Sequence, residues 1–325
     1  MSEPATDLAL VPLAAFDIRA DGSAVVAPDT GPRAPDGFAY RWLHMNLTDA
    51  ALAGWSAQNL PPLAARALLA SKTRPRVDSD ADGLVMTLRG INLNEGSEQA
   101  DMVSLRLWLT PRLVVTVRRQ RVFAMEALRD QMRAGKGPAS AGEFLAWVNE
   151  ALVDRIETVS LALEDLADDL EDAVYERAED PPRDLPHLRR ETIKLRRHVG
   201  PMSDALNDLS KIESPVVTDD LRPRLRYTAN RARRSMEELS EVHERLTALA
   251  DHLDIQQASR LERNGYRLSV AAAIFLPLGF LTGLFGVNVG GMPGTGDPMA
   301  FWWLTGGMVV LGLVTAVVLR LLRWF

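Results

Sequence analysis

Residues 268–296 read LSVAAAIFLPLGFLTGLFGVNVGGMPGTG and contain no charged side chain. After Asp297, a second uncharged stretch over residues 298–319 reads PMAFWWLTGGMVVLGLVTAVVL. Each stretch holds an apolar segment close to the ~20 residues that a helix needs to cross the hydrocarbon core of a bilayer. A buried helical hairpin of a soluble protein is the alternative. Aromatic residues at the ends of both segments favour a membrane interface instead, and these include Tyr266, Trp302 and Trp303.

Basic residues flank the two apolar segments on one side only. Three arginines precede the first segment and two follow the second, whereas residues 287–300 contain no Lys or Arg. Positive charge collects on the cytoplasmic side of membrane proteins, so we expect both termini in the cytoplasm and the short loop outside. Residues 1–7 are acidic where a signal peptide needs positive charge. The five flanking residues are Arg260, Arg263, Arg267, Arg320 and Arg323.

The overall composition excludes several classes of protein. The chain has 325 residues, of which 47% are hydrophobic and 25% charged, with a net charge of −6 and no cysteine. A negative net charge argues against nucleic acid as a partner, and the lack of cysteine excludes disulfide scaffolds, cysteine-ligated zinc and thiol catalysis. The phosphate-loop, dinucleotide-binding, HExxH and GxSxG motifs are also missing. We therefore expect no enzymatic activity.

The pattern of apolar residues divides the chain into three parts. Short β-like runs and short helices alternate before residue 138, and long helical patterns follow. The sequence thus predicts an α+β cytosolic domain, a long helical stalk and two C-terminal transmembrane helices. The predicted strands are 40–47, 84–93, 103–109 and 113–118, with helices at 61–70 and 122–134. The predicted domains are 1–138 (α/β), 139–264 (helical hairpin and stalk helix) and 265–325 (membrane domain, with spans at about 266–286 and 301–320 and a loop at 287–300).

Three long helices are expected after residue 138. Ser140 and Glu143 have the spacing of a capping box, which predicts the start of a helix of about forty residues. That helix is rich in Asp and Glu, whereas the next, from about Leu185 to Lys211, is rich in Arg. We interpret this as complementary pairing of the two neighbours, the alternative being a cation-attracting acidic belt. The last helix is expected to run ~65 residues from cytosol into membrane, with a kink at Pro277.

A stripe of mostly small residues follows the first membrane span at alternating steps of four and three. Such a face either lets helices pack closely in lipid or lines a narrow water-filled pore. One chain with two spans cannot enclose a channel, so transport requires several chains around a common axis. The stripe consists of Gly265, Ser269, Ala272, Leu276, Gly279 and Gly283.

The same helical phase becomes acidic before the membrane. Rings of carboxylates around an axis would attract cations, and an ordinary solvated helix face is the alternative. No two histidines lie three or four residues apart, so each is expected to be a single surface or capping residue, and any cation should meet mainly oxygen ligands. The acidic positions are Glu237, Glu241, Glu244, Asp251 and Glu262.

Residues 275–294, FLPLGFLTGLFGVNVGGMPG, resemble the CorA metal-ion transporter family, whose signature is Gly-Met-Asn where this chain has Gly286, Val287 and Asn288. The Gly-Val-Asn form, followed by Gly-Gly-x-Pro-Gly, is similar to the zinc-transport branch of that family. A second match to this branch is LRGINLN over residues 88–94, followed by DMVSLRLW over residues 101–108. The resemblance covers the whole chain.

The resemblance implies a homopentamer of the bacterial inner membrane, in which the first span lines the pore and the long helices form a cytosolic funnel. Asn288 would then form a ring that holds a hydrated cation, with Gly286 and Val287 shaping the turn. Asp251 falls on a position associated with regulatory divalent cations between subunits. The pore-facing positions of the family correspond to Gly265, Leu268, Leu276, Gly279, Gly283 and Asn288, close to the small-residue stripe.

These observations lead to one main hypothesis and two rivals. We expect a transporter that moves Zn²⁺ into the cytosol, with coupling to protons, and that holds no tight cofactor. Its partners would be further copies of the chain, the lipid bilayer and divalent cations. The first rival is a CorA-like Mg²⁺, Co²⁺ or Ni²⁺ channel. The second is a membrane-anchored coiled-coil scaffold, which predicts apolar heptad positions throughout the stalk.

Overall fold

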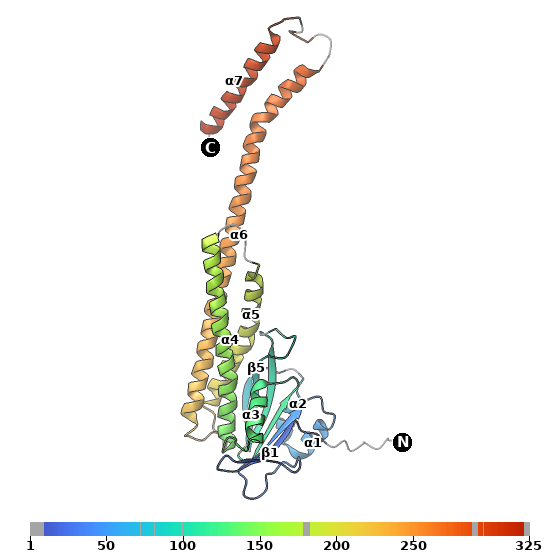
Figure 1. Cartoon of the computed structure of the whole chain (residues 1–325), viewed down its shortest axis with the longest axis vertical. Helices are drawn as coiled ribbons and strands as arrows, with labels where there is room; N and C mark the ends of the chain where they lie inside the picture. Colours follow the sequence, from blue (N-terminus) through green and yellow to red (C-terminus); the bar gives the residue numbers. More distant parts are fainter. Residues whose placement is uncertain are drawn as a thin grey trace, which may run out of the picture. The chain divides into compact units, whose positions relative to one another are not determined.

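The chain falls into two compact units, one up to Leu249 and one from Ala250 onward. The helix α6 (Arg222–Gly286) contributes to both units (Figure 1). The computed structural model describes residues 10–71, 73–80, 82–98, 100–177, 183–287, 292–294 and 296–321.

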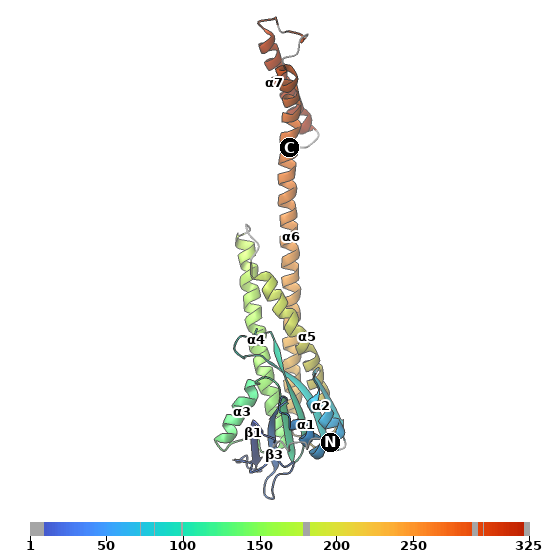
Figure 2. The same ribbon diagram turned by 90° about the vertical axis from the view of Figure 1, so that its right-hand side faces the viewer.

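The first unit contains a seven-stranded sheet of order β2-β1-β3-β7-β6-β5-β4 (Figure 2). The strands β3 and β7 pair in parallel, and each of the other neighbouring pairs is antiparallel. The strands are β1 (Ala14–Ile18), β2 (Ala24–Val26), β3 (Tyr40–Asn46), β4 (Arg76–Asp80), β5 (Gly83–Ile91), β6 (Met102–Thr110) and β7 (Leu113–Arg118).

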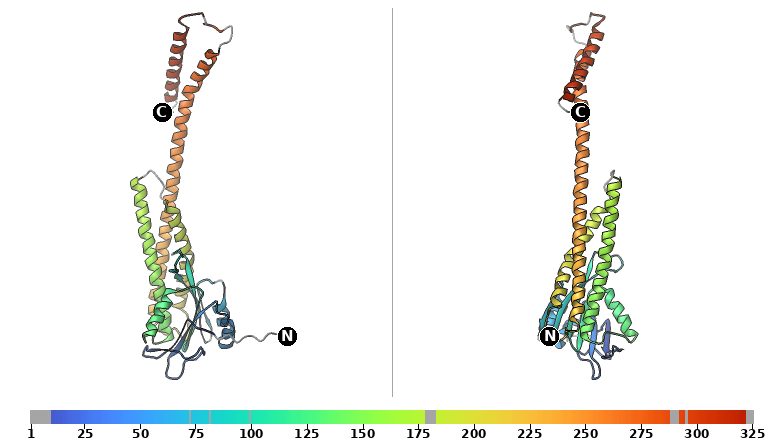
Figure 3. Two further views of the ribbon diagram at one scale, coloured as in Figure 1. Left: turned by 45° about the vertical axis from the view of Figure 1, so that its right-hand side comes forward. Right: turned by 90° about the vertical axis from the view of Figure 1, so that its left-hand side faces the viewer.

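Helices cover both faces of this sheet (Figure 3). Val85 and Trp108 belong to a core cluster with residues of α1 and α2. Gly90, which points to the other face because side chains alternate along a strand, approaches α4: a Cβ there would lie 2.8 Å from Cδ2 of Leu152. The sheet is therefore buried on both sides. The helices of this unit besides α6 are α1 (Leu52–Asn59), α2 (Pro62–Leu69), α3 (Phe123–Arg133), α4 (Ala141–Arg177) and α5 (Leu185–Leu209).

The predicted α+β architecture with a long helix and two apolar C-terminal helices is confirmed. The start of α4 follows the predicted capping box: Oγ of Ser140 accepts a hydrogen bond from the amide of Glu143 at 3.1 Å, and the Glu143 carboxylate accepts one from the amide of Ala139 at 2.8 Å. The helix α6 has the expected 65 residues and contains Pro277. The strands β1, β2 and β4 and the helix α1 were not predicted.

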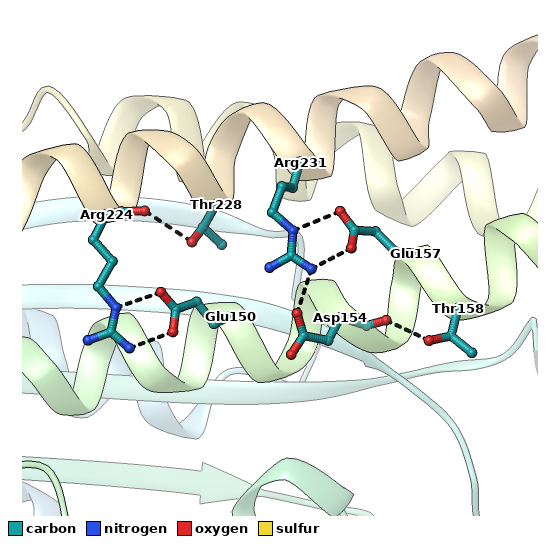
Figure 4. A network of polar contacts seen from close by, with 7 residues as sticks. All are labelled: Glu150, Asp154, Glu157, Thr158, Arg224, Thr228 and Arg231. Carbon is teal, nitrogen blue, oxygen red and sulfur yellow. Dashed lines mark hydrogen bonds and ion pairs between the residues drawn. The ribbon is translucent and has the colours of Figure 1, made fainter.

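The predicted pairing of the acidic and basic helices is wrong for the ion pairs that the structure describes. Arg224, Arg231 and Arg245 of α6 donate to Glu150, Glu157 and Glu171 of α4, respectively (Figure 4). Each pair is 74 residues apart, so α4 and α6 run in the same direction and stay in register. Lys194 of α5 instead bonds to Glu98 and Asp101 in the β5–β6 connection. The ion pairs described for α4 therefore join it to α6 and not to α5, the next helix in the sequence.

A hydrogen-bonded network centred on Thr116 lies inside the sheet unit. Its hydroxyl accepts a hydrogen bond from Nε1 of Trp42 at 2.8 Å and lies 2.8 Å from Nδ1 of His44. Nε of Arg118 donates to Nε2 of His44 at 3.1 Å, so Nδ1 carries the proton of a neutral ring. The imidazole of His44 is fully buried, which corrects the expectation that every histidine is a surface or capping residue.

We expect His44 to make the protein less stable in acid. Burial, together with the charges of Arg118 and Arg129, lowers the pKa of His44 from 6.5 to about 3. Below pH 6.5 the unfolded chain binds a proton that the folded chain does not, so stability falls as the pH drops from 6.5 toward 3. The expected loss between pH 7 and pH 5 is about 2 kcal/mol.

Urea unfolding of the full-length protein in detergent at pH 7 and pH 5 measures this loss, and His44→Gln is the control because its amide does not titrate. The difference between the two pH values should be smaller in the variant by the expected amount. An identical pH dependence of both proteins would contradict the assignment.

Candidate ion pathway

In the part of the chain that the structure describes, two helices are long and apolar enough to cross a membrane, namely α6 and α7 (Ala300–Leu321). The most apolar 18 residues of α6 and of α7 have mean hydropathies of 2.1 and 2.0, respectively. Only 6% of each of these stretches is buried inside the chain. A core helix of a soluble protein would be mostly buried. Exposed apolar helices of this length are therefore suited to a lipid or protein environment outside the single chain.

Within the second unit, one face of α6 packs against α7. Val270 of α6 and Leu319 of α7 are each less than 10% exposed. Nearer the loop, a Cβ built on Gly312 would lie 3.9 Å from Cδ1 of Leu278. These contacts fix which side of α6 faces α7.

The small-residue stripe lies on the face of α6 that α7 does not cover. Leu268 and Leu276 are 73% and 74% exposed, and Ser269 and Ala272 are exposed as well. A Cβ added at any of the three stripe glycines would meet no atom of the described residues within 4 Å, so the contacts within these parts of the single chain do not require their small size. These glycines are Gly265, Gly279 and Gly283.

This face of α6 bears oxygen atoms but no charge within the membrane segment. Oγ of Ser269 donates to the carbonyl of Gly265 at 3.0 Å, and Oγ1 of Thr282 donates to the carbonyl of Gly279 at 3.0 Å. Each hydroxyl thus satisfies its proton locally and keeps oxygen lone pairs available as acceptors. Such a surface suits weak contacts with water or with a hydrated ion rather than tight binding.

The predicted selectivity motif is only partly described. The helix α6 ends at Gly286, and Val287 follows with its side chain exposed, whereas Asn288 lies outside the described residues. Across the connection, Oδ1 of Asp297 accepts a hydrogen bond from the amide of Met299 at 2.9 Å. The carboxylate therefore stabilises the turn that immediately precedes α7.

The five predicted acidic positions of α6 are all exposed: Glu237, Glu241 and Glu244 in the first unit, and Asp251 and Glu262 in the second. Glu237 lies 3.8 Å from Arg233. Among the described residues, no group of three His, Asp or Glu side chains is arranged to hold a metal ion. Within one chain, the acidic residues form an exposed negative surface and not a metal centre.

Sequence reasoning missed the register between α4 and α6. Its signal is present in the sequence as glutamates at seven-residue spacing on one helix and arginines seven or fourteen residues apart on the other, as in a parallel coiled coil. The glutamates are Glu150, Glu157, Glu164 and Glu171, and the arginines are Arg224, Arg231 and Arg245.

Comparison with known proteins assigns a family to this arrangement. Residues 38–321 match the model of the family described as CorA-like Mg²⁺ transporter protein. The chain is similar to zinc transport protein ZntB of Pectobacterium atrosepticum, with 34% identity over 83% of each chain. It is also similar to the divalent cation transporter CmaX of Pseudomonas aeruginosa, with 34% identity over 87% of each chain. The structure of full-length CmaX superposes with a TM-score of 0.79 and 32% identity over 99% of this chain and 100% of CmaX.

Proposed function

The chain belongs to the family of CorA-like Mg²⁺ transporter proteins, and from that membership we propose that it carries Zn²⁺ into the cytosol across the bacterial inner membrane. That the chain is a divalent cation transporter of this family follows from the matches themselves. The choice of ion, the direction, the assembly and the pathway are the parts that we propose.

The observation that carries the proposal is the uncovered small-residue face of α6. Among the described residues, a Cβ at any of its three glycines would meet nothing within 4 Å, so these positions are free of packing constraints there. Two spans cannot surround a pore, so we propose that five chains place this face around a common axis. Gly265, Leu268, Ser269, Ala272, Leu276, Gly279 and Gly283 would then line the pathway.

The acidic positions of α6 support cation entry. Exposed carboxylates that repeat along one helix become rings of negative charge when several chains share an axis, and such rings raise the local concentration of cations. Glu237, Glu241, Glu244, Asp251 and Glu262 would contribute to these rings, with Asp251 as a contact for divalent ions between subunits. We propose the same carboxylates as candidates for proton coupling.

The preference for Zn²⁺ over Mg²⁺ is supported by the outer loop. Val287 replaces the methionine of the family signature, and Asp297 is the only acidic residue between Gly286 and Ala300. In this proposal Asn288 holds the ion through its hydration water. The Mg²⁺, Co²⁺ or Ni²⁺ channel stays the rival within transport.

The positions of basic and aromatic residues support the orientation. The described arginines at the spans precede the first span or follow the second in the sequence, and Phe301, Trp302 and Trp303 at the start of α7 are exposed, as expected of an interfacial belt. We therefore place both termini in the cytoplasm and the 287–300 loop outside.

Zinc flux into proteoliposomes tests the proposal, with an internal zinc dye and vesicles prepared with and without a pH gradient. Wild-type protein should admit Zn²⁺, and a dependence on the gradient would indicate proton coupling. Asn288→Ala should lose most of this flux because the ring that holds the hydrated ion loses its amides. Mg²⁺ measured in the same vesicles decides between the two ions.

Either of two results would reject transport of zinc through this pathway. One is the absence of flux from wild-type protein, which a scaffold with tethering helices also predicts; the other is flux from Asn288→Ala equal to that of the wild type. Asn264→Ala is the matched control, because the same change then falls on an exposed residue outside the stripe and should leave the flux unchanged.

A further inference from the structure

The interface between α4 and α6, here called the seam, repeats one interaction at a constant register. Nε of Arg224 donates to Glu150 at 2.6 Å, Nε of Arg231 to Glu157 at 2.9 Å and Nε of Arg245 to Glu171 at 3.0 Å. In each pair a second guanidinium nitrogen bonds to the other carboxylate oxygen, as Figure 4 shows for the first two. Paired bonds of this kind are the strongest form of ion pair.

The register defines a further level of the seam at which the pattern fails. Glu164 and Glu238 are also 74 residues apart, in the interval between the pairs of Arg231 and Arg245, but both side chains are carboxylates. Both are partly buried, and the structure records no ion pair for either in the part of the chain that it describes. Like charges placed opposite each other across a helix interface are unfavourable.

The charged groups around Glu238 do not neutralise its repulsion with Glu164. Glu157 and Glu164 face it from α4, and Glu237 and Arg234 are its neighbours on α6. Burial, followed by the charges of Glu164 and Glu157, raises the pKa of Glu238, and Arg234 opposes them only in part. At the levels of Arg231 and Arg245, Asp154 and Asp168 add a second carboxylate. At the level of Glu238, the residue of α4 that corresponds to Asp154 and Asp168 is Leu161, which has no charge.

The core of the seam is also polar at this level. Ser160 of α4 and Ser235 of α6 are fully buried, and neither hydroxyl oxygen has a hydrogen-bond partner among the residues that the structure describes. The corresponding positions one heptad further on are Ala167 and Val242, both buried and apolar. A buried hydroxyl without a partner contributes a desolvation cost and little packing.

We propose that the level formed by Ser160, Glu164, Ser235 and Glu238 is a built-in weak point of the seam, at which the C-terminal part of α4 separates from α6 when both carboxylates are charged. Two independent observations coincide there: the missing arginine at the surface and the unsatisfied hydroxyls in the core. Protonation of Glu238 closes the weak point, and deprotonation opens it. The proposal concerns the first unit alone and holds for either transported ion.

Hydrogen exchange of the full-length protein in lipid nanodiscs, followed by mass spectrometry, tests the weak point directly. Glu238→Arg completes the series of arginines, so amides of α4 over residues 161–175 should exchange about fivefold more slowly. Amides over residues 141–156 should keep their rates. Glu244→Arg is the matched control, because it makes the same change of charge at an exposed position of the same helix.

A second comparison tests the role of the proton. In wild-type protein, protection of residues 161–175, corrected for intrinsic exchange, should increase as the pH falls from 8 to 5.5, because the folded state takes up a proton at Glu238. Glu238→Gln has nearly the same shape and no titration, so it should be protected at both pH values.

Three outcomes would overturn the proposal. In the first, Glu238→Arg leaves the exchange of residues 161–175 unchanged. In the second, Glu244→Arg slows it equally. In the third, Glu238→Gln keeps the pH response of the wild type.

Discussion

Replacing Gly279 with leucine is expected to reduce Zn²⁺ flux into proteoliposomes to the level of protein-free vesicles, while the protein still folds. Among the described residues, a Cβ at Gly279 meets no atom within 4 Å, so we expect a larger side chain there to leave the packing of α6 on α7 intact. If the stripe lines the pathway, leucine side chains from all subunits narrow it together and remove water from it. Dye-based flux, with size-exclusion chromatography as the measure of folding, gives the result.

Gly306→Leu is the control for this variant. Gly306 lies on α7, and a Cβ there also meets nothing within 4 Å, so both variants add the same side chain to an equally open position. Unchanged flux is expected from Gly306→Leu. Normal flux through Gly279→Leu would contradict the assignment of the stripe to the pathway, and equal loss in both variants would show that the bulk of leucine, and not its position, is responsible.

Replacing Arg41 with methionine is expected to lower the free energy of unfolding by about 3–5 kcal/mol. Nε and Nη2 of Arg41 donate to the two oxygens of Asp17 at 2.7 and 2.9 Å, and both side chains are only 2% exposed. Removal of the guanidinium leaves the buried carboxylate of Asp17 without its partner. The resulting loss of free energy of unfolding is larger than the net stabilisation that the intact ion pair provides. Chemical unfolding of the full-length protein in detergent measures the change.

An exposed pair of the same type provides the comparison. Arg76 and Asp78 lie 3.2 Å apart on β4, with both side chains about half exposed, so Arg76→Met should cost less than ~1 kcal/mol. The double variant Asp17→Leu with Arg41→Met should regain much of the lost stability, since no unpaired charge is then buried. Similar losses in Arg41→Met and Arg76→Met would contradict the role given to burial.

The elements that the sequence predicted correctly have a strong local signal. Residues 113–118 are mostly β-branched and follow a turn at Pro111, and β7 has these same bounds. By contrast, β2 has only three residues, and β4 is the polar sequence RVDSD at the edge of the sheet. Neither has an apolar face long enough to be recognised, because pairing with a neighbouring strand, and not burial, determines them.

The partners of α4 could not be read from neighbouring segments. Its acidic residues and the basic residues of α5 are adjacent in the chain, yet the ion pairs join residues 74 positions apart. The heptad repeat found here consists of charged pairs between two helices of one chain, whereas the scaffold hypothesis predicts apolar heptad positions throughout the stalk. The stripe of α6 was identified from spacing alone, and in the structure it lies on one exposed face; its role as a pore lining stays a prediction. The role of Asn288 stays a prediction.

The constant register of 74 residues between α4 and α6 restricts where residues can be inserted into or deleted from the chain. Deleting one residue of α4 between Glu150 and Glu171 would turn every later side chain by about 100° and shift it by 1.5 Å along the axis, so the carboxylates beyond the deletion would miss their arginines. Insertions at residues 210–221, between α5 and α6, leave both helices intact. Tolerance to insertion and deletion is therefore expected to be confined to such connections and to be lost abruptly at the helix boundaries.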